Sequence, residues 1–419
     1  MISLRKNRER KGMRKKAVPK LSLVTDFLIY GGILLHITML IPSPVGSGGQ
    51  DIGIYLAFIL IAATRKTDYR DIFFNRLSAV YLTYMLFLSL STLLALELSE
   101  ALVILTRGIS RSTALFFVIQ ILCKSRLRRD NIFALSLFPF FLAYLSATAY
   151  LPPLFGVDYG FEGLKSLGLW HNRTALYLNI VLPVSVLNFT LLKNKALKIT
   201  LGLFILLGAA AVPLTLSRGG IISFVLLAVM LTAGFSFTGP GALKRYRAAA
   251  YILLGAAVIS GILFFPRIIH RFETTEWDTF TGRSDTIWPA AIDAFRRRPF
   301  LGYGVQRLYN VTDIINPHTH NIFLQALFEG GVAGTLIYIL MLILFLKRAF
   351  TQVRAEKSTF YGLSFICVFF AVLLLHGMIE VVRLRSLAFF LSSIWFYDAY
   401  QNLKKPGSGG SPKPLPQGN

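Results

Sequence analysis

Charged residues are scarce in this sequence, and acidic residues are the scarcest of them. Only 15% of the 419 residues are Asp, Glu, Lys or Arg, whereas roughly 25% is typical of soluble domains. The 20 acidic residues face 44 basic ones, so the net charge is +24. Since 54% of the residues are hydrophobic, this composition excludes an ordinary soluble globular protein.

Cysteines and closely spaced carboxylates are almost absent as well. The two cysteines, Cys123 and Cys367, both lie in apolar runs, which excludes a disulfide framework and a cysteine-ligated metal. The sequence contains no Asp-x-Asp pair, so a divalent metal held by carboxylates has no support. We therefore predict no metal site and no cofactor.

Long apolar runs, by contrast, recur from Leu21 to the end of the chain. About twelve of them approach the roughly 17 to 25 residues needed to cross a hydrocarbon core. Their approximate bounds are 21–41, 52–64, 77–97, 101–123, 132–150, 174–192, 197–213, 219–236, 248–266, 320–346, 358–378 and 385–402. The sequence therefore predicts an all-α polytopic membrane protein with about twelve transmembrane helices.

The basic residues predict which side of the membrane each loop faces. If the N-terminus is cytoplasmic and each run crosses once, 30 of the 44 Lys and Arg fall in cytoplasmic pieces. The outer face receives 12, and the remaining two, Arg107 and Arg111, lie inside the fourth run. This distribution is typical of a multi-pass protein with both termini in the cytoplasm. The positive charge is thus a signal of topology, and we predict no nucleic-acid partner.

The apolar runs divide the chain into five regions. These are a basic cytoplasmic N-terminus (1–20), helices 1 to 9 (21–265), a large outer loop (266–319), helices 10 to 12 (320–402) and a Gly/Ser/Pro-rich tail predicted to be disordered (403–419). In the outer loop, Asp285 can cap an amphipathic helix that has Pro289 in its first turn and stops at Pro299. We expect this helix to lie on the bilayer, and the alternative is a lid packed on the transmembrane helices.

Polar and cationic residues gather where the outer loops meet the apolar runs. The clusters are His171-Asn172-Arg173, Ser217-Arg218-Gly219-Gly220, Gly282-Arg283-Ser284-Asp285 and His318-Thr319-His320-Asn321. A guanidinium group binds phosphate oxygens bidentately, so Arg173, Arg218 and Arg283 together suit a pyrophosphate. The alternative for each arginine alone is an anchor to lipid phosphate. A transporter would instead need paired charges within the runs, and the few ionisable residues there, such as Asp26 and His376, show poor pairing.

His320 begins the tenth run and is a candidate general base, because an imidazole can accept a proton near neutral pH. His318 lies two residues away and competes for this role. Further along, the glycines in the stretch from Glu329 to Gly334 predict that the helix bends where another backbone approaches. A packing hinge without a catalytic role is the alternative there.

These residues resemble a known family. His320-Asn321, nine residues, Gly331, two residues and Gly334 are similar to the signature of bacterial O-antigen ligases. Ser217-Arg218-Gly219, Gly282-Arg283-Ser284 and the Gly302-Tyr303-Gly304 turn resemble the wider superfamily of these ligases and the O-antigen polymerases. The resemblance covers roughly residues 170–334 by motif and the whole chain by topology.

The resemblance implies transfer of a glycan from undecaprenyl pyrophosphate to lipid A-core at the periplasmic face of the bacterial inner membrane. It assigns the catalytic role to His320 and binding of the donor pyrophosphate to Arg173, Arg218 and Arg283. Supporting residues are Asn172, Ser217, Asp285, His318 and Asn321. We expect an inverting, metal-independent reaction whose only partners are the donor, the acceptor and membrane lipids. The alternatives are an O-antigen polymerase, a protein O-oligosaccharyltransferase and, from another class, a lipid-linked glycan flippase or transporter.

Overall fold

The computed structural model describes residues 20–38, 48–65, 67–156, 171–237, 265–274, 283–306, 308–314, 318–354, 359–378 and 384–404, with a few positions between 251 and 262. Every secondary-structure element in these residues is a helix, which confirms the all-α prediction. Almost all of the predicted N-terminal region and tail, and much of the run at 248–266, lie outside the described residues.

The helices begin and end within a few residues of the predicted runs. The single helices are α2 (Lys20–Thr38), α3 (Gly48–Thr64), α5 (Arg76–Ala95), α8 (Arg128–Leu154), α9 (His171–Leu191), α10 (Lys195–Leu214), α11 (Arg218–Phe237) and α16 (Ile322–Arg354). The fourth run forms α6 (Leu98–Ile104) and α7 (Arg111–Lys124), joined by a π-helical turn at Leu105–Ser110. The last two runs contain α17 (Thr359–Val368), α18 (Leu384–Ser392) and α19 (Phe396–Lys404). Short helices outside the runs are α4 (Tyr69–Phe73), α13 (Phe265–Thr274) and α15 (Trp288–Arg297).

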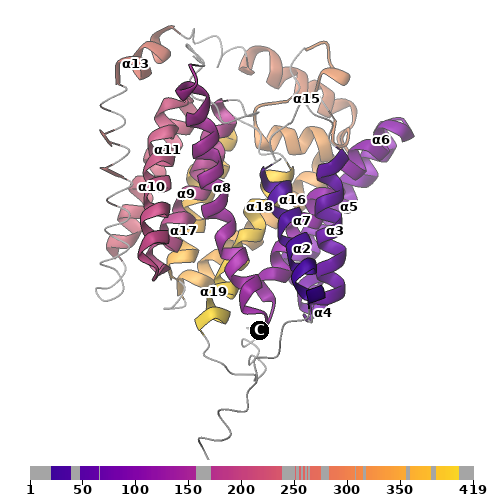
Figure 1. The fold of residues 1–419 in the computed structure, drawn as a ribbon. Coiled ribbons are helices and arrows are strands. Elements are labelled where there is room, and N and C mark those ends of the chain that lie inside the picture. The colour runs from indigo at the N-terminus through magenta and orange to yellow at the C-terminus, as the bar shows by residue number, and fades with distance from the viewer. Residues whose placement is uncertain are drawn as a thin grey trace, which may run out of the picture.

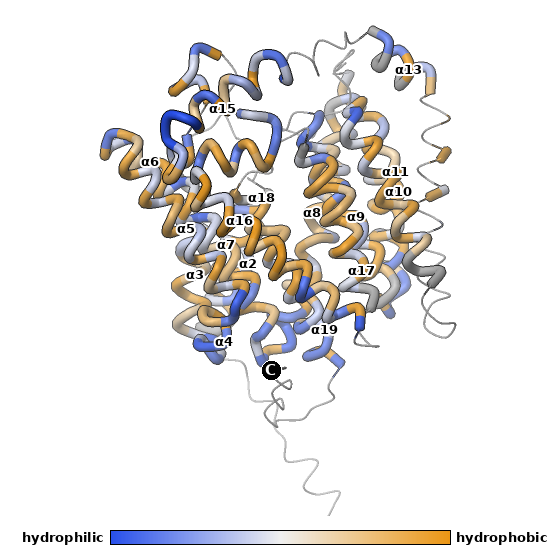
Figure 2. The backbone as a smooth tube through the Cα atoms, turned by 180° about the vertical axis from the view of Figure 1, so that it is seen from behind, coloured by the Kyte–Doolittle hydropathy of each residue, from blue (hydrophilic) through white to orange (hydrophobic). Residues whose placement is uncertain are grey.

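The helices pack side by side as a bundle with apolar side chains along their length and polar residues at both ends (Figures 1 and 2). Among the described residues, five helical stretches are long and apolar enough to cross a membrane: Arg76–Ala95, Leu98–Lys124, Arg128–Leu151, Lys195–Leu214 and Ile322–Arg354. Large apolar side chains such as Leu86 and Leu336 are exposed on them, as lipid contact requires. The chain is therefore a membrane protein, and the number of twelve crossings stays a prediction.

Described parts of the loops predicted to be cytoplasmic lie at one end of the bundle. Figure 1 shows α4 and α19 at this end and α13 and α15 at the other. Ion pairs connect different loops there, since Lys124 lies 2.6 Å from Asp71 and Arg348 lies 2.8 Å from Asp398. This separation of the loops supports the predicted alternation, and the identity of the cytoplasmic side stays a prediction.

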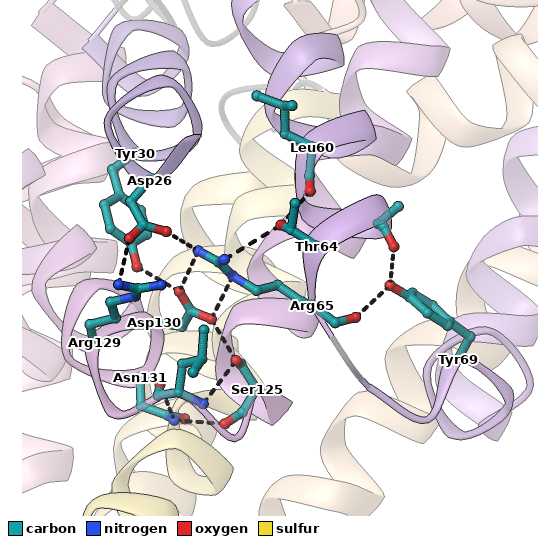
Figure 3. Close-up of polar contacts among 12 residues, drawn as sticks. Asp26, Tyr30, Leu60, Thr64, Arg65, Tyr69, Ser125, Arg129, Asp130 and Asn131 are labelled. Atoms are coloured by element: carbon teal, nitrogen blue, oxygen red, sulfur yellow. Dashed lines mark hydrogen bonds and ion pairs between the residues drawn. The ribbon is translucent and has the colours of Figure 1, made fainter. Parts of the chain in front are cut away.

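A buried cluster of charges joins α2, α3 and α8 at the same end (Figure 3). Arg65 lies 2.5 Å from Asp26 and 3.0 Å from Asp130, and Arg129 lies 2.7 Å from the second oxygen of Asp26. The hydroxyl of Tyr30 donates to Asp130 at 2.5 Å. The prediction that Asp26 is poorly paired with other charges is thus wrong. Its partners could not be seen in the local sequence, because they come from distant parts of the chain. The cluster lies at the helix ends, so it does not form a charge pathway along a helix.

We expect Asp130→Asn to lower the free energy of unfolding by about 3 kcal/mol, because it leaves Arg65 buried with half of its neutralising charge. The measurement is the denaturation midpoint of the protein in detergent. Asp71→Asn is the matched control, since the Asp71 side chain is 62% exposed and its ion pair with Lys124 contributes little. Equal shifts in the two variants would contradict a stabilising role for the cluster.

The predicted helix of the outer loop is α15, which is preceded by a π-helical turn at Arg283–Ile287. Pro289 lies in its first turn as predicted. Asp285 does not cap it, because the chain is already helical at Arg283 and the Asp285 carboxylate accepts from the Ser284 hydroxyl at 2.9 Å. The buried Ala291 and Ala294 pack with residues from the following loop and α16. This packing supports the alternative that α15 is a lid packed on the transmembrane helices, and it does not support a helix lying on the bilayer.

Candidate active site

The loop from His318 to Asn321 is fixed against α16 and α15. The side chain of Asn321 accepts from the backbone N–H groups of Phe323 and Leu324 at 2.9 and 3.1 Å, so it caps α16. Thr319 between the two histidines is fully buried, and its carbonyl accepts from the indole of Trp288 at 3.0 Å. Asn321 is therefore a helix cap, and its supporting role in the reaction stays a prediction.

The two histidines of this loop differ in their surroundings. His320 has a φ of +51°, a left-handed conformation that non-glycine residues seldom adopt and that is associated with functional sites. A guanidinium nitrogen of Arg173, in the first turn of α9, lies 3.4 Å from Nε2 of His318. The structure thus brings Arg173 to the histidine loop, and His318 is the residue that meets it.

Arg218 is the first residue of α11, a helix that packs against α9. Ser217 caps this helix, because its hydroxyl accepts from the N–H of Gly220 at 3.1 Å. A Cβ at Gly220 would lie only 2.4 Å from that of Ala175, so α11 and α9 approach closely at their first turns. The Ser-Arg-Gly-Gly run therefore places Arg218 at the same end of the bundle as Arg173.

Arg283 opens the π-helical turn before α15, and both Arg283 and the neighbouring Ser284 are half-buried. The hydrogen bond from Trp288 to Thr319 connects this element to the histidine loop. Asp285 is exposed and its carboxylate faces Ser284, and Asn172 lies half-buried in the first turn of α9. All four predicted clusters thus lie at one end of the bundle, whereas Asp285 has no supporting contact with the histidine loop among the described hydrogen bonds.

The predicted bend in α16 occurs at Gly331, which has φ 58° and ψ −161°. The loop before the histidines pairs with this bend through its backbone. Tyr303 and Gly304 donate to the carbonyls of Phe328 and Glu329 at 2.9 and 2.8 Å, and Val332 donates to the carbonyl of Pro299 at 2.7 Å. The glycine spacing therefore makes a junction between α16 and the outer loop, as the sequence predicts.

A cavity of about 560 Å³ opens beside this junction. Its wall comes from α5, the π-helical turn at Leu105–Ser110 with the helices on either side of that turn, the loop after Gly304, His318, α16 and α18. The polar lining residues are Tyr84, Glu100, Ser112, Gln306, Tyr309, Asn310, His318, Gln325, Glu329 and Tyr338. His318 is the histidine of the loop that lines it.

Glu329 is the site residue that the sequence analysis does not single out. It appears there only as the start of the glycine run that bends the helix. One signal could have identified it, because Glu329 is the only acidic residue in the apolar run 320–346. An ionisable residue within such a run is functional more often than structural.

Residues 203–339 match the family model described as O-antigen ligase. This segment belongs to the O-antigen ligase superfamily. The match contains Arg218, Arg283, His320 and the bend at Gly331, whereas Arg173 lies before it. No similar sequence was found among the curated proteins.

The match therefore covers three of the four polar clusters, those at 217–220, 282–285 and 318–321. In the part of the chain that the structure describes, no group of three or more His, Cys, Asp or Glu side chains is arranged to hold a metal ion. The permanently charged cationic groups of the four polar clusters are Arg173, Arg218 and Arg283, and guanidinium groups can neutralise phosphate oxygens directly.

Proposed function

We propose that the protein is an inverting, metal-independent glycosyltransferase that moves O-antigen glycan from undecaprenyl pyrophosphate to a sugar hydroxyl of lipid A-core. The observation that carries this proposal is the contact of Arg173 with His318, a residue that lines a cavity. Through this contact, a side chain proposed to bind phosphate lies beside a cavity that is large enough for a small molecule. The superfamily match supports the use of a lipid-linked glycan.

The arginines act on the donor. Arg173, Arg218 and Arg283 hold the pyrophosphate and stabilise the negative charge that develops on it as the bond to the sugar breaks. Because a guanidinium group keeps its charge at any physiological pH, this stabilisation needs no metal. The positions of Arg173 and Arg218 at the first turns of two closely packed helices support a shared role.

His320 acts on the acceptor in this proposal. It orients the attacking hydroxyl or accepts its proton, and the oxygen attacks the anomeric carbon from the face opposite the pyrophosphate, which inverts the configuration. The capping of α16 by Asn321 supports this role, because it fixes the backbone next to His320.

The reaction takes place at the periplasmic face of the bacterial inner membrane, with both termini in the cytoplasm. The distribution of basic residues supports this orientation. The acyl chains of donor and acceptor remain in the bilayer, so both substrates approach the site sideways between helices.

The decisive experiment is transfer by purified protein from a glycan on undecaprenyl pyrophosphate to lipid A-core, with and without a chelator. We expect equal transfer in both conditions, measured as the mobility shift of the lipid product. Loss of transfer in chelator that added Mg²⁺ restores would contradict a metal-independent reaction. Extension of a second lipid-linked glycan would identify a polymerase, modification of a protein would identify an oligosaccharyltransferase, and movement of the donor across vesicles without transfer would identify a flippase.

A further inference from the structure

The cavity beside the bend of α16 is charged differently from the arginine clusters. Among its described lining residues, the formally charged ones are Glu100 and Glu329, and neither Lys nor Arg is present. Carboxylates repel a pyrophosphate, whereas they accept hydrogen bonds from sugar hydroxyls. This space therefore suits an uncharged sugar and not the phosphate end of the donor.

Glu329 is held in the cavity wall with its carboxylate in a defined position. The side-chain amide of Gln325 donates to Oε1 of Glu329 at 2.7 Å, and its oxygen accepts from the N–H of Thr319 at 3.1 Å. The backbone carbonyl of Glu329 accepts from Gly304 and from the hydroxyl of Ser91 at 2.8 and 3.0 Å. Gln325 thus connects the carboxylate directly to the histidine loop.

Tyr338, nine residues further along α16, offers a hydroxyl group to a polar ligand in this space. Its side chain is only 2% exposed and lines the cavity, and its hydroxyl has no hydrogen-bond partner in the described structure. An unpaired buried hydroxyl costs about 1 to 3 kcal/mol. A sugar hydroxyl placed between Tyr338 and Glu329 would satisfy it.

His318 connects the cavity to the proposed donor site. This residue lines the cavity and contacts Arg173, one of the proposed phosphate-binding residues. A sugar held in the cavity would therefore lie beside the anomeric carbon of a donor whose pyrophosphate is bound at the arginines.

We propose that this cavity binds the acceptor sugar and that the Glu329 carboxylate is the base of the reaction. The inference rests on the proposed glycosyl transfer and identifies the acceptor half of its site. The hydroxyl proton passes to Glu329, and the oxygen forms a bond to the anomeric carbon. The bond from that carbon to the phosphate oxygen breaks, and its electron pair leaves with undecaprenyl pyrophosphate. His320 then positions the substrates, and Tyr338 binds the acceptor.

The test compares Glu329→Gln, Tyr338→Phe and His320→Ala in the purified full-length protein, with lipid A-core as acceptor. We expect Glu329→Gln to lower kcat about 100-fold with little change in the acceptor KM, because the amide keeps the shape of the side chain but accepts no proton. The acidic limb of the pH–rate profile should disappear in this variant. Tyr338→Phe should raise the acceptor KM about tenfold, as expected for one lost hydrogen bond. His320→Ala should keep the acidic limb.

Glu97→Gln is the matched control, because Glu97 is exposed and is not among the residues that line the cavity, and it should leave kcat within about twofold. Retention of donor binding shows that each variant is folded. If Glu329→Gln does not fold, Glu329→Asp replaces it in the test, and we expect that variant to keep part of the activity. Normal kcat in Glu329→Gln, with transfer by the unmodified protein, overturns the role of Glu329 and leaves the proposed function standing. Transfer only to a second lipid-linked glycan overturns the ligase proposal, and the same variants then test the cavity with that acceptor. Absence of transfer to either acceptor overturns both.

Discussion

Replacing Arg173 with alanine is expected to lower the rate of glycan transfer about 1,000-fold. The loss has this size because one positioned donor to a developing negative charge contributes about 100- to 1,000-fold, and a charged arginine contributes at the upper end. Arg173→Lys should recover only part of the rate, since an ammonium group binds phosphate through one point and not through a fork. Single-turnover measurement with saturating donor separates this effect from weaker binding.

The control for Arg173 is Arg296→Ala. Arg296 is an exposed arginine of α15 paired with Asp293 at 3.1 Å, and its removal should leave transfer within about twofold. An Arg173→Lys variant with the full rate would argue against bidentate phosphate binding. An Arg173→Ala variant that transfers normally would remove the residue from the donor site, whatever its contact with His318.

Replacing Gly331 with alanine is expected to abolish transfer and to lower the free energy of unfolding by about 3 kcal/mol. A Cβ at Gly331 would lie 2.5 Å from the carbonyl carbon of Phe300 and 2.6 Å from the carbonyl oxygen of Pro299. The positive φ of Gly331 adds strain of about 1 to 2 kcal/mol for any other residue. Because the backbone cannot move aside without breaking its hydrogen bonds, the outer loop must separate from α16.

The measurement for Gly331→Ala is the denaturation midpoint together with the rate of transfer. Gly31→Ala is the control, because Gly31 lies in α2 and nothing lies within 4 Å of its added Cβ. That substitution should leave the protein as stable as before or slightly more stable, since alanine favours a helix. A Gly331→Ala variant as stable and as active as Gly31→Ala would contradict the role of the junction.

The helices could be predicted from the sequence because their signal is local. Each apolar run carries its own length and its own flanking polar residues, so α10 occupies 195–214 where the run 197–213 predicts it. The cluster around Arg65 could not be predicted, because its partners Asp26 and Asp130 lie 39 and 65 residues away along the chain. Such pairings depend on how helices pack, and no local pattern encodes that.

In the candidate site, too, some features could be predicted from the sequence and others could not. Asn321 and Ser217 both cap helices that the sequence predicts, as short polar side chains at helix starts often do, although the sequence analysis names them only as supporting residues. The family signature assigns the catalytic role to His320, whereas the contact of His318 with Arg173 could not be predicted, because the two residues lie 145 positions apart in the chain. Glu329 lies in the cavity wall for a reason that only the fold reveals, namely the pairing of its backbone with Gly304.

The junction between the outer loop and α16 has a consequence for the divergence of such proteins. It is made of backbone hydrogen bonds, and they require only glycines at a fixed spacing. Side chains on either side can therefore change in evolution while the geometry beside the histidine loop persists. A chain without a similar sequence among the curated proteins can still match the O-antigen ligase family over 203–339. We expect natural variation among its homologues to be lowest in the glycine spacing and highest on the lipid-facing surfaces.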